Sequence, residues 1–104
     1  MHAIVRRYEG IDTKRTDELK QKVNASLTPR FSKLPGFGGY FLIEAGNGVM
    51  STVNFFDTSA QADESTRVVA EWLREEKLET LVPNAPKITG GEVIVKEMKS
   101  ELPA

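Results

Sequence analysis

The sequence predicts an α+β domain with the ferredoxin-like order strand–helix–strand–strand–helix–strand. Three observations lead to this prediction. Four short runs are rich in β-forming residues, two longer stretches carry apolar residues at helical spacing, and an Asn-Gly pair joins the two middle runs. This order gives a four-stranded antiparallel sheet with both helices on one face. At 104 residues, the chain fits a single domain over 1–104.

The first strand is expected over 2–9 (HAIVRRYE), which ends at a glycine. A helix is expected over 12–33, with Asp12 as its cap. Its apolar residues recur at three- and four-residue spacing: Leu19, Val23, Leu27, Phe31 and Leu34. Pro29 lies inside this pattern and should kink the helix or start a new turn, because proline lacks an N–H and clashes with the preceding turn.

A β-hairpin is predicted in the middle of the chain. The segment 34–39 (LPGFGG) breaks the helix, and 40–45 (YFLIEA) reads as the second strand. Asn47 and Gly48 favour a type I′ turn, which needs positive φ at both positions. The returning strand covers 49–56 (VMSTVNFF).

A second helix is predicted over 59–76, followed by a short helical turn over 77–83. Thr58 and Gln61 have the spacing of a capping box at its start. The last strand is expected over 92–98 (EVIVKEM), which contains three consecutive β-branched residues.

Alternation divides the strand residues between two faces of the sheet. One set is almost entirely apolar and is expected to pack under the helices: Ala3, Val5, Phe41, Ile43, Val49, Ser51, Val53, Phe55, Val93 and Val95. The other set mixes large apolar and polar residues: Ile4, Arg6, Tyr8, Tyr40, Leu42, Glu44, Met50, Thr52, Asn54, Phe56 and Ile94. Because its apolar part is too large for a face open to water, we expect a second copy of the chain, a ligand or both to cover it.

Composition narrows the classes of function. The net charge of −1 and the pI near 5.8 give no electrostatic reason to expect binding to nucleic acid or to anionic membranes. The absence of cysteine excludes disulfides and thiolate chemistry. We see no signal-peptide pattern and no apolar run of the roughly 20 residues that span a bilayer, so a cytoplasmic protein is expected.

The chain resembles the dimeric α+β barrel superfamily, in particular its antibiotic-biosynthesis-monooxygenase-like domains. The order of elements matches over nearly the whole chain. A helix with Pro29 leads into LPGFGGYFLI, which is similar to the family's G-x-x-G-Y start of the second strand. The segment STVNFFDTSAQADES is similar to the family segment in which a strand ends in an aromatic and an acidic residue before a helix cap.

The resemblance implies a homodimer whose two sheets face each other and close a barrel. It also implies pockets between sheet and helices or in the barrel interior. Members include cofactor-independent monooxygenases of polyketide aromatics, haem-degrading enzymes, isomerases, dehydratases and proteins without assigned activity, so the fold does not settle the function. Haem-degrading members use a helical histidine and an asparagine on the first strand. Here the single histidine is His2, at the terminus, which argues against haem.

Several residues are candidates for a site. Arg6, Tyr8 and Asn54 are predicted to act in catalysis, with the Arg6 guanidinium holding a carboxylate or enolate oxygen and Tyr8 donating a hydrogen bond or a proton. The predicted substrate contacts are Tyr40, Leu42, Glu44, Phe56 and Trp72. The alternatives are a polar network between subunits, in which Arg6 and Glu44 neutralise each other, and a core position for Trp72. Under either interpretation, Met50 and Phe56 are expected in the core of the dimer interface. No metal or cofactor site is expected.

The favoured hypothesis is a cofactor-independent monooxygenase-like enzyme acting on an aromatic or polyketide-like small molecule. The alternative is a non-catalytic dimeric protein that binds small molecules or is associated with stress. An RNA-binding sheet ranks last, because VMSTVNFF lacks the basic and glycine positions of an RNP motif.

Overall fold

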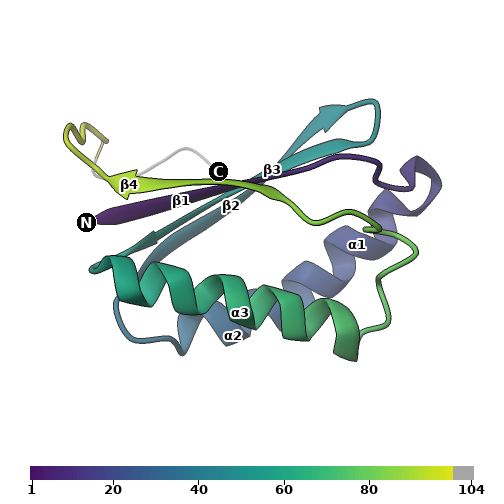
Figure 1. Ribbon diagram of the computed structural model, residues 1–104, viewed down its shortest axis with the longest axis horizontal. Helices are drawn as coiled ribbons and strands as arrows, with labels where there is room; N and C mark the ends of the chain where they lie inside the picture. The colour runs from purple at the N-terminus through teal and green to yellow at the C-terminus, as the bar shows by residue number, and fades with distance from the viewer. Residues whose placement is uncertain (100–104) are drawn as a thin grey trace.

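The computed structural model describes residues 1–99 of the chain; the remaining five positions of the predicted domain lie outside the described residues. Within residues 1–99, a four-stranded antiparallel sheet of order β2-β3-β1-β4 carries the helices on one face (Figure 1). The strands are β1 (His2–Tyr8), β2 (Phe37–Gly46), β3 (Val49–Phe56) and β4 (Lys87–Glu92). The helical segments are η1 (Thr13–Arg15), α1 (Thr16–Lys22), η2 (Val23–Leu27), α2 (Thr28–Ser32) and α3 (Ser59–Glu75). The predicted α+β class and element order are confirmed.

Local signals place the hairpin and the second helix where we predicted them. Asn47 and Gly48 both have positive φ, 54° and 76°, and form the two-residue turn between β2 and β3. At the start of α3, the Thr58 hydroxyl accepts a hydrogen bond from the Gln61 N–H, and the Gln61 side chain accepts one from the Thr58 N–H. The capping box is therefore confirmed.

The first helical region is continuous but contains a π-helical turn, η2, directly before Pro29. The N–H of Thr28 bonds to the carbonyl of Val23, five residues back. A wider turn moves the backbone ahead of proline outward, which relieves the clash that proline causes in an α-helix. The sequence predicted a kink or the start of a new turn at Pro29. The structure has a π-helical turn before it, and the helical segment α2 starts with Pro29 in its first turn.

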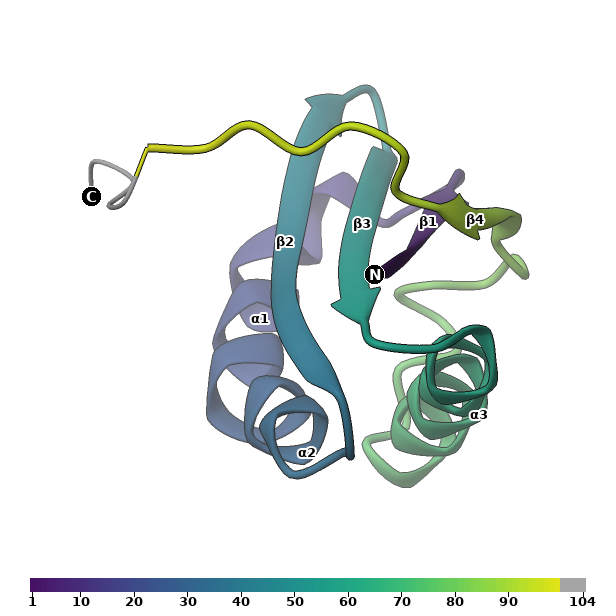
Figure 2. The ribbon, with the colours of Figure 1, turned by 90° about the vertical axis from the view of Figure 1, so that its left-hand side faces the viewer.

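The last strand was predicted over 92–98 and is observed at Lys87–Glu92. The chain returns from α3 at the Arg7 end of β1, where Lys87 pairs with Arg7, and pairing ends when Glu92 reaches His2. The position of β1 thus decides which residues form the strand, and this outweighs the higher β-propensity of the following segment. Ile94 and Val95 of that segment are 89% and 81% exposed, and past β4 the chain turns toward the β2 side instead of continuing alongside β1 (Figure 2).

The assignment of the two sheet faces was wrong. The mixed set lies under the helices: Ile4, Arg6, Tyr8, Met50, Thr52, Asn54 and Phe56 are all buried. Buried positions of α3 follow the helical spacing and include Ser65 beside Ala62 and Val69. The helix therefore brings a polar group to the polar part of the sheet, which makes the mixed face the inner one.

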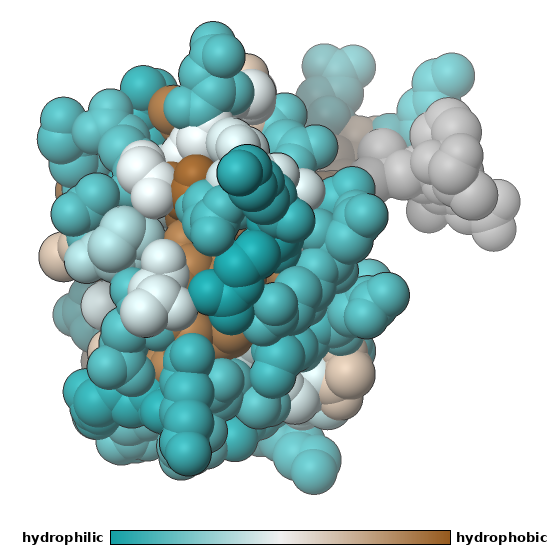
Figure 3. All heavy atoms as spheres, turned by 90° about the vertical axis from the view of Figure 1, so that its right-hand side faces the viewer, coloured by the Kyte–Doolittle hydropathy of each residue, from teal (hydrophilic) through white to brown (hydrophobic). Residues whose placement is uncertain are grey.

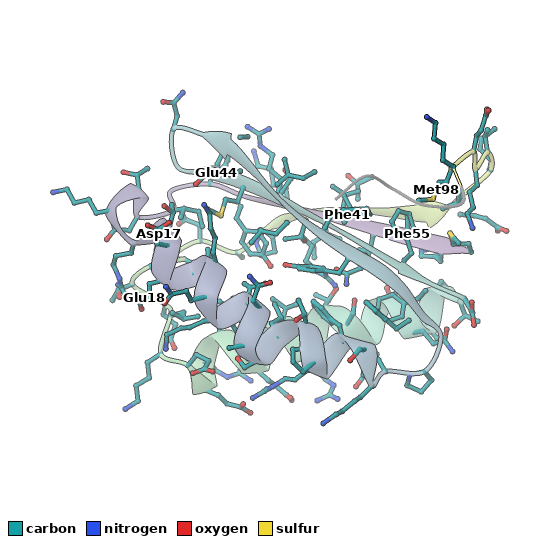
Figure 4. The ribbon with its side chains drawn as sticks, turned by 180° about the vertical axis from the view of Figure 1, so that it is seen from behind. Asp17, Glu18, Phe41, Glu44, Phe55 and Met98 are labelled. Carbon is teal, nitrogen blue, oxygen red and sulfur yellow. The ribbon has the colours of Figure 1, made fainter. Side chains whose placement is uncertain are left out.

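The apolar set forms the outer face. Phe41 and Ile43 of β2 are 45% and 48% exposed, and Val53 and Phe55 of β3 are only partly buried. The rings of Phe41 and Phe55 pack edge to face, with centroids 6.3 Å apart (Figure 4). We call this outer apolar surface, made of Ala3, Val5, Phe41, Ile43, Val53 and Phe55, the open sheet face. None of the helices formed by residues 1–99 is both long and apolar enough to cross a membrane.

Candidate functional site

A small cavity lies between the sheet and the helices. Its volume is about 40 Å³. It is lined by Tyr8, Ile11, Leu19, Val23, Leu27, Tyr40, Leu42, Met50, Thr52, Val69, Trp72, Leu73 and Val82. At roughly 10–15 Å³ for each water, the cavity has room for a few waters and not for an aromatic ring. A larger ligand can bind only if the walls move apart.

The cavity adjoins a cleft of about 320 Å³ between η2 and β2. The two share Val23, Tyr40, Leu42 and Met50. Hydrophobic side chains come to the surface between hydrophilic ones at the end of the molecule where α1 begins and α3 ends (Figure 3). The π-helical turn forms part of the wall of both spaces, and such turns are frequent at functional sites. An outward shift of η2 would join the cavity and the cleft.

Arg6 ties three elements together beneath the helices. It is 1% exposed, and its Nη1 donates to Asn54 Oδ1 at 2.8 Å. Its Nη2 lies 2.6 Å from Ser65 Oγ and 2.8 Å from Thr66 Oγ1, so β1 is joined to both β3 and α3. Ser65 in turn donates to the carbonyl of Ala62, which fixes its hydroxyl as an acceptor for Arg6.

This guanidinium has no carboxylate partner among the described residues, because every ion pair formed by 1–99 involves other basic groups. Three buried polar atoms beside it also lack a hydrogen-bond partner: Arg6 Nε, Thr52 Oγ1 and Asn54 Nδ2. Thr52 pairs with Arg6 across the sheet and lines the cavity. The polar cluster thus borders the apolar cavity at its sheet side, and we call Arg6, Thr52, Asn54, Ser65 and Thr66 the Arg6 cluster.

Two phenols lie close to the Arg6 cluster. Burial raises the pKa of Tyr8, and the charge of Arg6 partly offsets this rise. Burial also raises the pKa of Tyr40, with a further contribution from Tyr8. Both side chains therefore stay protonated at neutral pH and can donate hydrogen bonds, but they are poor general bases. Burial lowers the pKa of Arg6, although an arginine remains charged at neutral pH.

The raised pKa values predict a loss of stability in alkaline solution. A phenol with a raised folded-state pKa contributes its stabilisation in full below the unfolded-state pKa of about 10 and loses it as pH rises further. Above about pH 10, each phenol that ionises only on unfolding lowers the free energy of unfolding by about 1.4 kcal/mol per pH unit. Urea unfolding over this range should show the decline, and Tyr40→Phe should make it shallower. An equal slope in Tyr40→Phe would contradict the protonated, buried state of Tyr40.

The structure places the predicted site residues in three groups. Tyr8, Tyr40, Leu42 and Trp72 line the cavity. Arg6 and Asn54 lie beside it in the Arg6 cluster, so the three predicted catalytic residues stay together. Glu44 is exposed and lines the cleft, and its carboxylate does not pair with Arg6.

Phe56 lies elsewhere. It packs in a separate buried cluster with Ile4 and Ala62 and is not among the cavity-lining residues. It was also expected, with Met50, to form the core of a dimer interface. Both side chains are buried under the helices of a single chain, so that expectation is wrong.

Trp72 is a core residue that also forms part of the cavity wall. It is 1% exposed, and its Nε1 donates to Ser26 Oγ at 2.6 Å. The indole N–H is therefore occupied by η2 and is not free to orient a ligand. Sequence reasoning missed Ser65 and Thr66. The signal was available, because Ser65 falls on the apolar stripe of α3 where a hydroxyl needs a buried partner.

Residues 1–99 bring together no set of three or more histidine, cysteine or acidic side chains able to hold a metal ion.

Comparison with known proteins identifies structures that share the fold of this chain. No protein-family model and no curated protein matches the sequence. Among solved structures, a protein of unknown function from Nitrosomonas europaea, NE2512, matches with a TM-score of 0.74 and 18% identity, over 96% of this chain and 95% of that one. An arginine-to-serine variant of MhuD with two manganese protoporphyrin IX molecules per active site matches with a TM-score of 0.74 and 14% identity, over 95% of this chain and 100% of that one.

The monooxygenase ActVA-Orf6 of Streptomyces coelicolor, whose structure was solved in complex with nanaomycin D, matches with a TM-score of 0.64 and 12% identity. The match covers 99% of this chain and 92% of that one. Other matches are described as antibiotic biosynthesis monooxygenases. The chain therefore has the fold of the antibiotic-biosynthesis-monooxygenase-like dimeric α+β barrel proteins over nearly its full length.

A porphyrin does not fit the residues found here. The cavity lining contains no histidine, cysteine or carboxylate to ligate a metal. The single histidine, His2, begins β1 and pairs with Phe56 and Glu92 at the far end of the strand from Tyr8. We therefore derive no haem chemistry for this chain.

Proposed function

We propose that this protein is a cofactor-independent monooxygenase-like enzyme that oxidises an aromatic or polyketide-like small molecule in the space between sheet and helices. The observation that carries the proposal is an apolar cavity that meets the Arg6 cluster at Thr52. Thr52 lines the cavity and pairs across the sheet with Arg6, a buried guanidinium that has no carboxylate partner within residues 1–99. An apolar wall suits a ring system, and a guanidinium stabilises the negative charge that develops on a ring oxygen as the substrate loses a proton.

The proposed reaction needs only the substrate and molecular oxygen. A ring C–H proton passes to water that enters from the cleft, because the cavity lining holds no carboxylate or histidine to accept it, and the carbanion left behind is stabilised by the neighbouring oxygen. The carbanion passes electrons to O₂ and forms a C–O bond. The resulting peroxide loses water, so that a CH₂ group becomes a carbonyl with one oxygen atom in the product and one in water. Tyr8 and Tyr40 are placed to donate hydrogen bonds to the oxygen intermediates.

We further propose that the active form is a homodimer closed through the open sheet face. That face is apolar and contiguous, and Phe41 and Ile43 expose nearly half of their side-chain surface in a single chain. The partner sheet would cover it and leave the helix-side cavity of each subunit intact. The proposed interface is therefore opposite to the face expected from the sequence.

Oxygen consumption with a panel of hydroxylated naphthalenes and anthrones tests the catalytic proposal. We expect turnover by the wild type and a loss of about 100-fold in kcat for Arg6→Gln or Asn54→Ala, the size seen when a donor to a developing oxyanion is removed. Arg74→Gln is the matched control, since Arg74 is exposed on α3, away from both the Arg6 cluster and the open sheet face. Equal kcat values for Arg6→Gln and wild type would count against the proposal.

A non-catalytic small-molecule-binding role is the second candidate. It is favoured by one observation, which is that no carboxylate or histidine lines the cavity to act as a general base. Saturable binding of the same aromatics, with neither oxygen uptake nor product formation, would identify this role.

A further inference from the structure

We propose that the Arg6 cluster is an oxyanion subsite, and that the protein binds its aromatic ligand as an anion, a phenolate or carboxylate, with loss of a proton to solvent. This inference deepens the proposed function by naming the charge state of the ligand, and it holds for a binding protein as well as for an enzyme.

The first step of the argument concerns charge. A buried ion is costly unless it is paired, and buried arginines are normally paired with a carboxylate. Arg6 is 1% exposed, yet its three partners, Asn54, Ser65 and Thr66, are all neutral. Among residues 1–99 no acidic group lies within ion-pairing distance of it. A ligand anion would supply the missing negative charge.

The second step concerns hydrogen bonds. The Arg6 Nε–H and the Asn54 amide N–H are donors without an acceptor, and the Thr52 hydroxyl can donate as well. Polar atoms of this kind are rarely left unpaired in a folded interior. Because these unused groups can all donate, their natural partner is an acceptor-rich oxygen. An ionised oxygen accepts more strongly than a neutral one.

The third step concerns direction. Thr52 both pairs with Arg6 across the sheet and lines the cavity, so one of the three unused groups borders the space that a ligand would enter. Arg6 and Asn54 are not lining residues and lie behind Thr52, so the ligand oxygen would enter the Arg6 cluster past Thr52. The rest of the lining is apolar except for the two phenols, which can donate but do not neutralise a cation at neutral pH. The surroundings thus suit a ring with its oxyanion turned toward the sheet.

The proton balance follows. When a phenol binds, its O–H bond breaks, the oxygen stays beside Arg6 and the proton passes to the buffer. A carboxylate ligand is already ionised at neutral pH and releases no proton. The two sources of the oxyanion are therefore distinguishable by whether binding releases a proton.

The test uses 4-nitrophenol, whose ionised form absorbs visible light whereas its neutral form does not. A pH titration of the bound probe on the wild-type protein should give a pKa at least one unit below that of the free probe, which means that the anion binds at least about tenfold more tightly than the neutral form. Arg6→Gln should remove this difference, and Arg74→Gln, which removes an exposed cation of α3, should keep it. In the wild type, 4-nitroanisole, which cannot ionise, should bind at least about tenfold more weakly than the phenolate.

The carboxylate arm uses 4-nitrobenzoate, whose binding should also depend on Arg6 but should release no proton in differently buffered calorimetry. Binding of 4-nitroanisole as tight as that of 4-nitrophenolate would overturn the inference without any variant. So would a lack of saturable binding by both anions. These binding titrations are independent of the oxygen-uptake assay. Anion-selective binding without turnover would contradict the enzymatic proposal and leave the oxyanion subsite standing. Turnover of a ligand that binds in its neutral form would contradict the subsite and leave the enzymatic proposal standing.

Discussion

Phe41→Glu should convert the proposed dimer into a single chain that stays folded. Phe41 lies on the open sheet face and is 45% exposed within one chain, so a glutamate there is solvated in the monomer. In the proposed dimer the same carboxylate would be buried against the apolar residues of the partner sheet, without a cation to pair with. Burying an unpaired charge costs several kcal/mol, so the dissociation constant should rise by about 100-fold or more.

Sedimentation velocity at micromolar concentration measures this change, and circular dichroism checks that the fold is kept. Ala70→Glu is the matched control, because Ala70 is exposed on α3 and the substitution adds the same charge away from the open sheet face. A wild-type protein that sediments as a single chain would contradict the dimer. A Phe41→Glu variant that dimerises as tightly as wild type would move the interface elsewhere.

Trp72→Ala should produce the largest loss of stability among single substitutions at the site. Trp72 is 1% exposed, packs in the main core cluster and borders an existing cavity. Truncating such a residue removes about 3–5 kcal/mol from the free energy of unfolding, because the walls only partly collapse into the space left behind. For a domain of this size each kcal/mol lowers Tm by roughly 4–8 °C.

Thermal and urea unfolding give the magnitude, with Ile88→Ala as the control, since Ile88 is 48% exposed and should cost little. Trp72→Phe keeps most of the packing but loses the hydrogen bond to Ser26, so it should lower the free energy of unfolding by about 1 kcal/mol. Indole added to Trp72→Ala should raise Tm by occupying the enlarged cavity. Loss of less than about 1 kcal/mol in Trp72→Ala would show that Trp72 is not packed as described.

Stability and function should separate at Arg6. Because no carboxylate pairs with it within residues 1–99, Arg6→Met leaves no orphaned charge behind, and the large penalty for breaking a buried ion pair does not apply. We expect its free energy of unfolding to fall by about 1–3 kcal/mol, because the buried Asn54 Oδ1 loses its donor, while binding of aromatic anions is lost. Parallel urea unfolding and 4-nitrophenol titration measure the two effects. A loss above about 4 kcal/mol would make Arg6 a structural residue first.

Much of the fold could be predicted because its signals are local. Asn47-Gly48 specifies its turn by backbone conformation alone, and Thr58 with Gln61 specifies the start of α3 through hydrogen bonds three residues apart. The grouping of Arg6, Tyr8 and Asn54 also followed from the sequence, since alternation decides which residues share a face.

The errors came from information that is not local. Alternation does not say which face the helices cover, and the apolar set was assigned to them although the mixed set meets Ser65 of α3. The last strand was displaced because the end of β1 sets where pairing begins and stops, whatever the propensity of the residues that follow. The cavity itself depends on the packing of η2 against β2, for which the sequence held only the hint of Pro29.

The central claim is that a ligand binds between helices and sheet, on the opposite side of the sheet from the proposed dimer interface. Nuclear Overhauser effects between bound 4-nitrophenol and the protein test it most directly, because neighbouring positions on β3 point to opposite faces. We predict contacts from the ring protons to the Met50 methyl group and the Trp72 indole, both of which line the cavity. Contacts to the Val53 methyls and the Phe55 ring, with none to Met50, would place the ligand on the open sheet face and contradict the account.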